Sequence, residues 1–353
     1  AAYLFSFTDT DFNGGTLEST IGKGYTGGKN LDLPILVPDS DADEFGTSVS
    51  LNSTGDRLAV GAPGDDGASN GSFDSGAAYL FSFTDTDFNG GTLESTIGNG
   101  YTGGKNVDVT NLDVTDAFGS AVSLNGAGDR LAVGAHDDDG AGDVSVNTGA
   151  AYLFSFTDTD FNGGTLESTL GSGYIGGKDV DVANLSISDE FGSSVSLNAA
   201  GDRLAVGADG DDGAGNAASS SGAAYLFSFT DTNFNGGTLE STIGKGYNGG
   251  KNVDVTILDN GDSFGSGVSL NGAGDRLAVG AEGDDGSGNA ASTSGAAYLF
   301  SFTDADFTGG TLESTIGSGY TGGKNVDVAN LGDFDRFGSA ISLNAAGDRL
   351  AVG

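Results

Sequence analysis

Residues 45–63 decide the fold of this chain, and they read Phe45-Gly-Thr-Ser-Val-Ser-Leu-Asn-Ser-Thr-Gly-Asp-Arg-Leu-Ala-Val-Gly-Ala-Pro63. Close copies of this stretch begin at Phe118, Phe191, Phe264 and Phe337. The arginines of the five copies are each 73 residues apart: Arg57, Arg130, Arg203, Arg276 and Arg349. A period this strict indicates a repeat architecture, in which each copy is one supersecondary unit.

Each copy predicts two strands joined by a turn. Phe45, Val49 and Leu51 share one parity, while small and polar residues occupy the other, which is the two-residue period of a strand. Residues 52–56 have the composition of a turn, and residues 58–62 resume the alternation of large and small side chains. Because the second face carries only Gly, Ala and Ser, we expect another sheet or backbone to approach it closely.

The order Phe-Gly, Gly-Ala-Pro and then a Gly-Ala-Ala-Tyr-Leu-Phe strand resembles the FG-GAP repeat of integrin α-subunit propellers and of many bacterial surface proteins. Only the first copy keeps Gly61-Ala62-Pro63, since His136, Asp209 and Glu282 replace the proline in later copies. The resemblance covers nearly the whole chain and implies that each copy is a blade of a β-propeller. Such a fold does not by itself fix a function.

The predicted fold is therefore all-β, a propeller of five FG-GAP-like blades of ~73 residues with about four strands each, twenty in all. Residues 1–353 are expected to form a single repeat domain, with tandem repeats starting at about 1, 77, 150, 223 and 296. The chain begins at an Ala-Ala-Tyr strand and ends after an Arg-Leu-Ala-Val-Gly strand. Pairing of these N- and C-terminal strands would close a ring, and an open tandem array of blades is the alternative.

The rest of each repeat predicts further strands and no helix. Residues 2–7 alternate as a strand, an Asn-Gly turn over residues 8–15 indicates a hairpin, and residues 16–21 form its second strand. The glycine-rich residues 22–32 are expected to form an ordered excursion with a short edge strand. The first repeat has three additional residues between Lys29 and Phe45, near Pro34 and Pro38, which predicts a surface loop there.

Composition excludes several classes of partner. The chain has 50 acidic residues against 13 Lys and Arg and a net charge of −37, so nucleic acid and anionic membranes are poor partners. It has no Cys, hence no disulfide or thiolate site, and no apolar run long enough to insert into a membrane. Because aromatic and branched residues recur in register, this acidity does not indicate disorder.

The sequence offers little to an enzyme. Its single histidine, His136, occupies a position that other copies fill with Pro, Asp or Glu, which favours a solvated loop residue. No Gly-x-Ser-x-Gly turn accompanies a histidine and an acid. We therefore predict that the chain is not an enzyme.

Two acidic loops are candidates for calcium binding. The first has oxygen-bearing side chains at alternate positions before a glycine, which resembles the opening of a calcium loop, although the pattern favours a hairpin with local turn bonds. Its candidate ligands are Asp9, Asp11 and Asn13, with copies Asp85, Asp87 and Asn89, and Asp158, Asp160 and Asn162.

The second acidic loop follows the Gly-Ala motif and carries adjacent carboxylates among glycines. Such carboxylates repel one another unless a cation or a water shell separates them. Its candidate ligands are Asp65 and Asp66, Asp138 and Asp139, Asp211 and Asp212, and Asp284 and Asp285. The acidic ladder that integrin-type repeats carry between their Phe-Gly and Gly-Ala-Pro strands is missing at residues 52–57, which indicates that this calcium site of the family is absent. Ca²⁺ is thus the one cofactor that the sequence suggests.

The recurring arginines are expected to neutralise loop acids or to bind carbonyls between blades. Two functions remain open. One is a structural or self-assembling extracellular protein of a bacterial cell surface, such as an adhesin, sheath or filament component, whose partners are its own copies or other surface components. The other is a propeller module that recognises a glycan or a matrix protein in a calcium-dependent way. Near-identical repeats favour the first.

Overall fold

The computed structural model describes residues 1–9, 11–36 and 42–353. All regular elements in these ranges are β-strands, and they contain no helix that could cross a membrane. The prediction of an all-β chain is therefore confirmed. The chain divides into two compact units, which we describe separately: residues 1–135 with 154–166, and residues 136–153 with 167–353.

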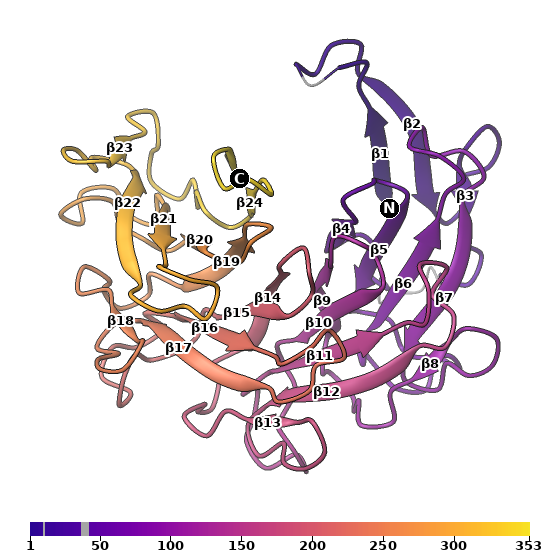
Figure 1. The fold of residues 1–353 in the computed structure, drawn as a ribbon, viewed down its shortest axis with the longest axis horizontal. Coiled ribbons are helices and arrows are strands. Elements are labelled where there is room, and N and C mark those ends of the chain that lie inside the picture. Colours follow the sequence, from indigo (N-terminus) through magenta and orange to yellow (C-terminus); the bar gives the residue numbers. More distant parts are fainter. Residues whose placement is uncertain (10, 37–41) are drawn as a thin grey trace. The chain divides into compact units, whose positions relative to one another are not determined.

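The first unit contains a three-stranded sheet and a five-stranded sheet (Figure 1). The three-stranded sheet has the order β1 (Ala2–Ser6), β2 (Thr16–Gly22) and β3 (Leu31–Asp32). The five-stranded sheet, called sheet 1, has the order β4 (Val49–Leu51), β5 (Arg57–Ala62), β6 (Ala77–Ser82), β7 (Thr92–Gly98) and β8 (Val107–Asp108). Neighbours in sequence are thus neighbours in each sheet.

The same order recurs three more times. Sheet 2 consists of β9 (Phe118–Leu124), β10 (Arg130–Ala135), β11 (Ala150–Ser155), β12 (Thr165–Gly171) and β13 (Val180–Asp181). Sheet 3, in the second unit, consists of β14 (Phe191–Leu197), β15 (Arg203–Ala208), β16 (Ala223–Ser228), β17 (Thr238–Gly244) and β18 (Val253–Asp254). Sheet 4, also there, consists of β19 (Phe264–Leu270), β20 (Arg276–Ala281), β21 (Ala296–Ser301), β22 (Thr311–Gly317) and β23 (Val326–Asp327). The strands β24 (Ile341–Leu343) and β25 (Leu350–Val352) form a two-stranded sheet.

The expectation of about four strands per repeat, twenty in all, is wrong, because each complete sheet has five strands and the described residues contain twenty-five. In sheet 3, β14, β15 and β16 each run antiparallel to the next strand. The fifth strand, β18, runs parallel to β17, with Ile243 opposite Val253. After β17 the glycine-rich segment loops back, so that Val253 and Asp254 run alongside the last two residues of β17 in the same direction. The predicted short edge strand is thereby confirmed.

Sheet 3 is buried on both faces where its aromatic residues lie. In sheet 3, the ring of Phe191 packs edge-on against Tyr225 and Phe227, with ring centroids 5.4 and 6.0 Å apart. All three side chains are fully buried. The Phe of the Phe-Gly motif is thus the centre of the apolar core that its own sheet forms.

Successive sheets meet through their glycines. A Cβ atom built on Gly207 of β15 would lie 2.0 Å from the carbonyl oxygen of Gly265 in β19. Gly265 has a φ of +106°, and a Cβ built there would lie 2.4 Å from the carbonyl oxygen of Ala223. Only glycine tolerates both the positive φ and this approach. The expected close approach at the small face is confirmed, and it explains why both Phe-Gly and Gly-Ala recur.

A backbone bridge accompanies this contact. Phe264 of sheet 4 bridges in parallel to Gly222, which precedes β16 of sheet 3, and its N–H donates to the carbonyl of Ser221 at 3.1 Å. The same bridge joins Gly76 to Phe118, Gly149 to Phe191 and Gly295 to Phe337. These repeats are therefore joined to the next ones by a backbone bridge of the same kind, which we call the joint.

The extra residues of the first repeat lie after Leu36. The prediction of a surface loop between Lys29 and Phe45 is wrong for Leu33 and Leu36, because both side chains are buried in the core of the first unit. Leu36 takes the place that Leu112, Leu185 and Leu258 hold in later repeats. Residues 37–41, which include Pro38, lie outside the described residues.

Candidate functional site

The first acidic loop bonds to its own backbone. Asp9 Oδ1 accepts hydrogen bonds from the N–H groups of Asp11 and Asn13 at 3.0 and 3.1 Å, and Asp9 Oδ2 accepts one from Asn13 Nδ2 at 2.8 Å. The bonds from the Asn13 side chain and backbone lower the pKa of Asp9. The same pattern holds for Asp85 with Asp87 and Asn89, and for Asp158 with Asp160 and Asn162. The loop thus has the geometry of a hairpin turn held by local bonds.

The tips of these loops bind basic residues of the preceding sheet. In the second unit, Arg203 of sheet 3 donates from Nε to the carbonyl of Ala305 and from Nη2 to Asp306 Oδ1, both at 2.7 Å. Lys251 pairs with Glu240 and donates to the carbonyl of Asp306 at 2.6 Å. In the first unit, Arg57 and Lys105 bind the carbonyl groups of Thr159 and Asp160 in the same way. The expected binding of carbonyls between repeats is confirmed for Arg57 and Arg203.

We expect Arg203→Ala to lower the free energy of unfolding by about 1–2 kcal/mol, because two charge-assisted bonds between sheets are lost at a largely buried side chain. Urea unfolding measures this. The matched control is Arg349→Ala, since Arg349 is 77% exposed and pairs with its neighbour Asp348. An equal loss in both variants would contradict a role of Arg203 between sheets.

The second acidic loop places one carboxylate in the interior. Asp211 is 1% exposed, and its carboxylate accepts hydrogen bonds from Tyr225 Oη at 2.6 Å, from Tyr247 Oη at 2.9 and 3.1 Å, and from the N–H of Gly213 at 2.7 Å. Equivalent clusters join Asp65 to Tyr79 and Tyr101, Asp138 to Tyr152 and Tyr174, and Asp284 to Tyr298 and Tyr320. We call this arrangement the Asp–Tyr–Tyr cluster.

Burial raises the pKa of Asp211, while the bonds from the two tyrosines and Gly213 oppose that rise. The second carboxylate of each pair serves the loop backbone instead. Asp212 Oδ1 accepts from the N–H of Ser220 at 2.7 Å, and Asp66, Asp139 and Asp285 do the same in their copies. Sequence reasoning singled out the acids but missed the tyrosines, although an Asp and two Tyr at constant spacing in every copy were the available signal.

We expect Tyr247→Phe to lower the free energy of unfolding by about 1–3 kcal/mol, because the buried Asp211 carboxylate loses a hydrogen-bond donor. Tyr25→Phe is the control. Tyr25 holds the equivalent place in the first repeat, where its hydroxyl contacts that of Tyr3 at 3.3 Å in an exposed position. Thermal unfolding of both variants distinguishes the cluster from a general effect of losing the hydroxyl group.

Two further buried carboxylates lie near these clusters. Asp189 accepts a hydrogen bond from the N–H of Ser186 at 2.7 Å, and burial together with the negative charges of Asp211 and Asp212 raises its pKa to about 7. Burial and the charges of Asp284, Asp259 and Asp285 likewise raise the pKa of Asp262 to about 7. The folded state thus holds protons on carboxyl groups at pH values where the unfolded chain releases them.

The two candidate calcium loops keep their carboxylates apart. In the part of the chain that the structure describes, no group of three or more His, Asp or Glu side chains is placed to hold a metal ion. In the first loop the first carboxylate, that of Asp9 and its equivalents, already binds N–H groups, and in the second the buried carboxylate binds hydroxyl groups. These arrangements do not fit a preformed Ca²⁺ site, and calcium binding there stays a prediction.

His136 lies half-buried where one repeat meets the next. Its Nε2 lies 3.4 Å from Asp137 Oδ2. Burial raises the pKa of the nearby Glu190 carboxyl, and the interaction with His136 opposes that rise. At the equivalent junction of the following repeats, Arg336 pairs with Glu282 at 3.4 Å. His136 thus belongs to a polar contact between repeats and is not the freely solvated residue that we predicted.

Comparison with known families connects this geometry to a repeat. A family model described as the FG-GAP repeat matches residues 39–81, 112–154, 184–227 and 259–300. Each match ends at the Phe of an Ala-Ala-Tyr-Leu-Phe strand, so it covers the first three strands of a five-stranded sheet. No curated protein matches the chain.

Proposed function

Because this chain belongs to the FG-GAP repeat family, we propose that it is a non-enzymatic structural protein of an extracellular or cell-surface assembly. The observation that carries the proposal is the joint between sheets, which repeats with the same glycine approach and the same parallel bridge along the chain. Near-identical repeats build an extended scaffold, whereas a catalytic centre requires unlike residues at one place. An adhesin, sheath or filament component of a bacterial surface fits this scaffold.

The proposed partners are further copies of the chain or other surface components. Sedimentation velocity and electron microscopy of the purified protein test this directly. Concentration-dependent polymers of regular appearance support self-assembly. Particles that stay monodisperse at every concentration, with and without calcium, would contradict it.

We propose further that the sheets are blades of a β-propeller. Strands β1–β3 have the sequences and order of β6–β8, and β24–β25 have those of β4–β5, so the two partial sheets together supply one full set of five strands. The aromatic face of β1 is uncovered, since Tyr3 is 54% exposed whereas its equivalent Tyr79 is fully buried. Small-angle scattering of a compact ring supports closure by these strands, and an elongated profile supports an open tandem array.

The non-enzymatic part of the proposal rests on the lack of a nucleophile, base and orienting group in one place among the described residues. Turnover of glycans, esters or phosphates that disappeared on changing a single carboxylate would contradict it.

A second candidate function, recognition of a glycan or matrix protein, is favoured by one feature of the second unit. A cavity of about 350 Å³ opens beside the Asp–Tyr–Tyr cluster of sheet 3. Its size lies in the range of ligand sites in proteins. Binding of a surface glycan by the purified chain, with and without calcium, tests this candidate.

We also propose that calcium stabilises the fold through its acidic loops. Folding brings the net charge of −37 into a smaller volume. A cation that binds only the folded state stabilises it by RT ln(1 + [L]/Kd) per site, where [L] is the free cation concentration and Kd its dissociation constant. The measurement is a thermal melt in EDTA, in millimolar calcium, and in sodium chloride of equal ionic strength. A higher Tm in calcium than in sodium supports bound ions, whereas equal values leave only screening.

A further inference from the structure

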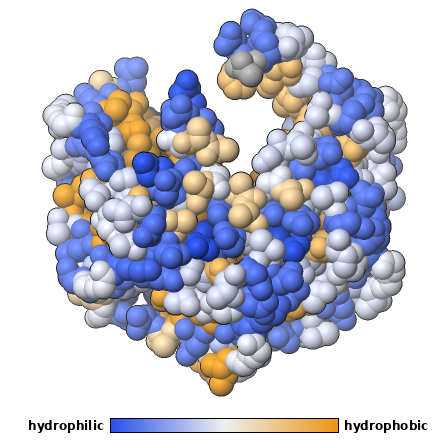
Figure 2. All heavy atoms as spheres, in the orientation of Figure 1, coloured by the Kyte–Doolittle hydropathy of each residue, from blue (hydrophilic) through white to orange (hydrophobic). Residues whose placement is uncertain are grey.

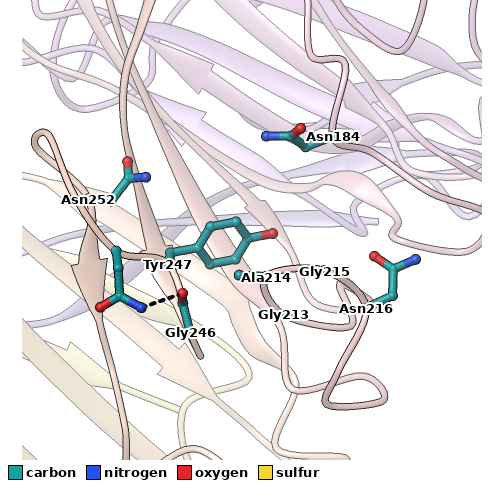
Figure 3. A pocket seen from close by; sticks show the side chains of 9 residues that line it. Asn184, Gly213, Ala214, Gly215, Asn216, Gly246, Tyr247 and Asn252 are labelled. Carbon is teal, nitrogen blue, oxygen red and sulfur yellow. Dashed lines mark hydrogen bonds between the residues drawn. The ribbon is translucent and has the colours of Figure 1, made fainter.

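The cavity of the second unit lies between two glycine-rich turns of sheet 3. One turn is residues 213–216, which follow the acidic pair, and the other is residues 246–248, which follow β17. Figure 3 shows Tyr247 in the middle, with Asn252 on one side of it and Asn184 and Asn216 on the other. The hydroxyl of Tyr247 is held by Asp211, which fixes the ring at the base of the cavity.

The asparagine side chains around the cavity keep part of their hydrogen-bonding capacity. Asn216 and Asn248 each use Nδ2, toward Ser186 Oγ at 3.0 Å and the carbonyl of Gly246 at 2.7 Å, so their oxygens remain as acceptors. Asn252 uses Oδ1, toward the N–H of Thr242 at 2.9 Å, so its NH₂ group remains as a donor. The amide of Asn184 makes no hydrogen bond with the described residues. The lining thus offers donors and acceptors together.

The lining contains no charged side chain, although the chain as a whole carries 50 acidic residues. Figure 2 shows how largely hydrophilic the visible surface is. Hydroxyl groups both donate and accept hydrogen bonds, so neutral amides with both capacities match them better than carboxylates do. A tyrosine ring supplies the apolar contact that one face of a sugar ring needs.

Among the repeats of sheets 2, 3 and 4, only that of sheet 3 has asparagine at all four positions. In the repeat of sheet 2 the equivalent residues are Asn111, Asp143, Ile175 and Asp179, and in that of sheet 4 they are Ile257, Asn289, Thr321 and Asn325. In the repeat of sheet 1 the equivalent residues are Ile35, Asn70, Thr102 and Asn106. The scaffold of the cavity is repeated, but its neutral amide lining is not.

We propose that this cavity, which we call the amide cavity, binds a neutral carbohydrate of one or two sugar residues. The proposal rests on the second candidate function and names its site and ligand class. Asn216 and Asn248 accept bonds from sugar hydroxyls, and Asn184 and Asn252 donate to them. The part of Tyr247 that lines the cavity, 8% of this residue being exposed, contacts the sugar ring. Acidic sugars are disfavoured, because the chain as a whole carries a net charge of −37.

The test uses a variant that has the residues found at the equivalent positions in the repeat of sheet 2. The substitutions Asn216→Asp, Asn248→Ile and Asn252→Asp convert the cavity to the lining of the preceding repeat, where Asp179 accepts the same bond from Thr169 N–H at 2.8 Å. The matched control is Asn106→Asp, which makes the equivalent change in sheet 1, where Asn106 accepts from Thr96 N–H at 2.9 Å. The whole chain is applied to an array of neutral and acidic oligosaccharides, and calorimetry follows with the neutral disaccharide that binds best.

We expect the wild type and Asn106→Asp to bind that disaccharide equally, and the triple variant to bind about 100-fold more weakly at unchanged Tm, since each lost bond is worth up to about tenfold. Equal binding by the triple variant would overturn the amide cavity as the site, yet leave glycan recognition by the chain intact. A wild type that binds only acidic sugars would overturn the ligand class. A wild type that binds no sugar at millimolar concentration would overturn the inference and the second candidate function together, and would leave self-assembly untouched.

Discussion

Gly207→Ala is expected to destabilise the protein by about 3 kcal/mol or more, because the new methyl group has no room between two sheets. The Cβ would lie 2.0 Å from the carbonyl oxygen of Gly265 and 2.3 Å from Ser194 Oγ. The first of these is backbone of the next sheet, which cannot rotate away. Since Gly207 does not have a positive φ, the effect is steric and comes from the joint alone.

The control for this effect is Gly332→Ala. Gly332 is exposed, lacks a positive φ, and its nearest contact to a built Cβ is the side chain of Asp335 at 3.9 Å. We expect this variant to stay within about 0.5 kcal/mol of the wild type in guanidinium unfolding. Similar stabilities of the two alanine variants would show that the sheets do not meet as described.

The double variant Asp189→Asn, Asp262→Asn is expected to be more stable than the wild type at pH 8, by up to about 4 kcal/mol per site. The pKa of each carboxyl is raised from 3.8 to about 7 in the folded state. A raised pKa contributes stability that is fully present below pH 3.8 and is lost as the pH rises through about 7. The amide stays neutral throughout and can still accept the bond from the local N–H.

Urea unfolding between pH 4 and pH 8 measures this difference. The two proteins should have similar stabilities near pH 4 and diverge as the pH rises toward 8. Asp335→Asn is the control, because Asp335 accepts the same kind of bond from Gly332 N–H at 2.8 Å but is exposed. Parallel pH profiles of the wild type and the double variant would contradict the burial of these charges.

Much of the fold follows from the sequence because its determinants are local and are repeated. The two-residue alternation after Phe45 and the Asn-Gly turn predict strands and hairpins, and copies in register predict that each will form again. The restriction of one strand face to Gly, Ala and Ser predicts the close approach between sheets, which Gly207 and Gly265 confirm. The sequence predicts the short edge strand at Val253, but the predicted total of four strands per repeat does not include it.

The candidate site was harder to predict because it depends on residues that are distant in sequence. Asp211 reads as a solvated loop acid until Tyr225 of β16 and Tyr247 of the turn after β17 are brought to it. The loop that contains Asp306 resembles a metal loop in sequence, yet its tip is held by Arg203, 103 residues earlier. Neither partner can be identified from local pattern, whereas constant spacing in every copy would have pointed to the tyrosines.

Hydrogen exchange of the Phe264 amide tests the central claim, that each sheet is joined to the next through its Phe-Gly strand, most directly. This N–H donates to the carbonyl of Ser221, in the loop that precedes β16 of sheet 3. If the joint forms, the Phe264 amide should exchange as slowly as amides within sheet 4, such as that of Val279 in β20. Exchange as fast as that of the exposed loop residue Gly249 would contradict the account.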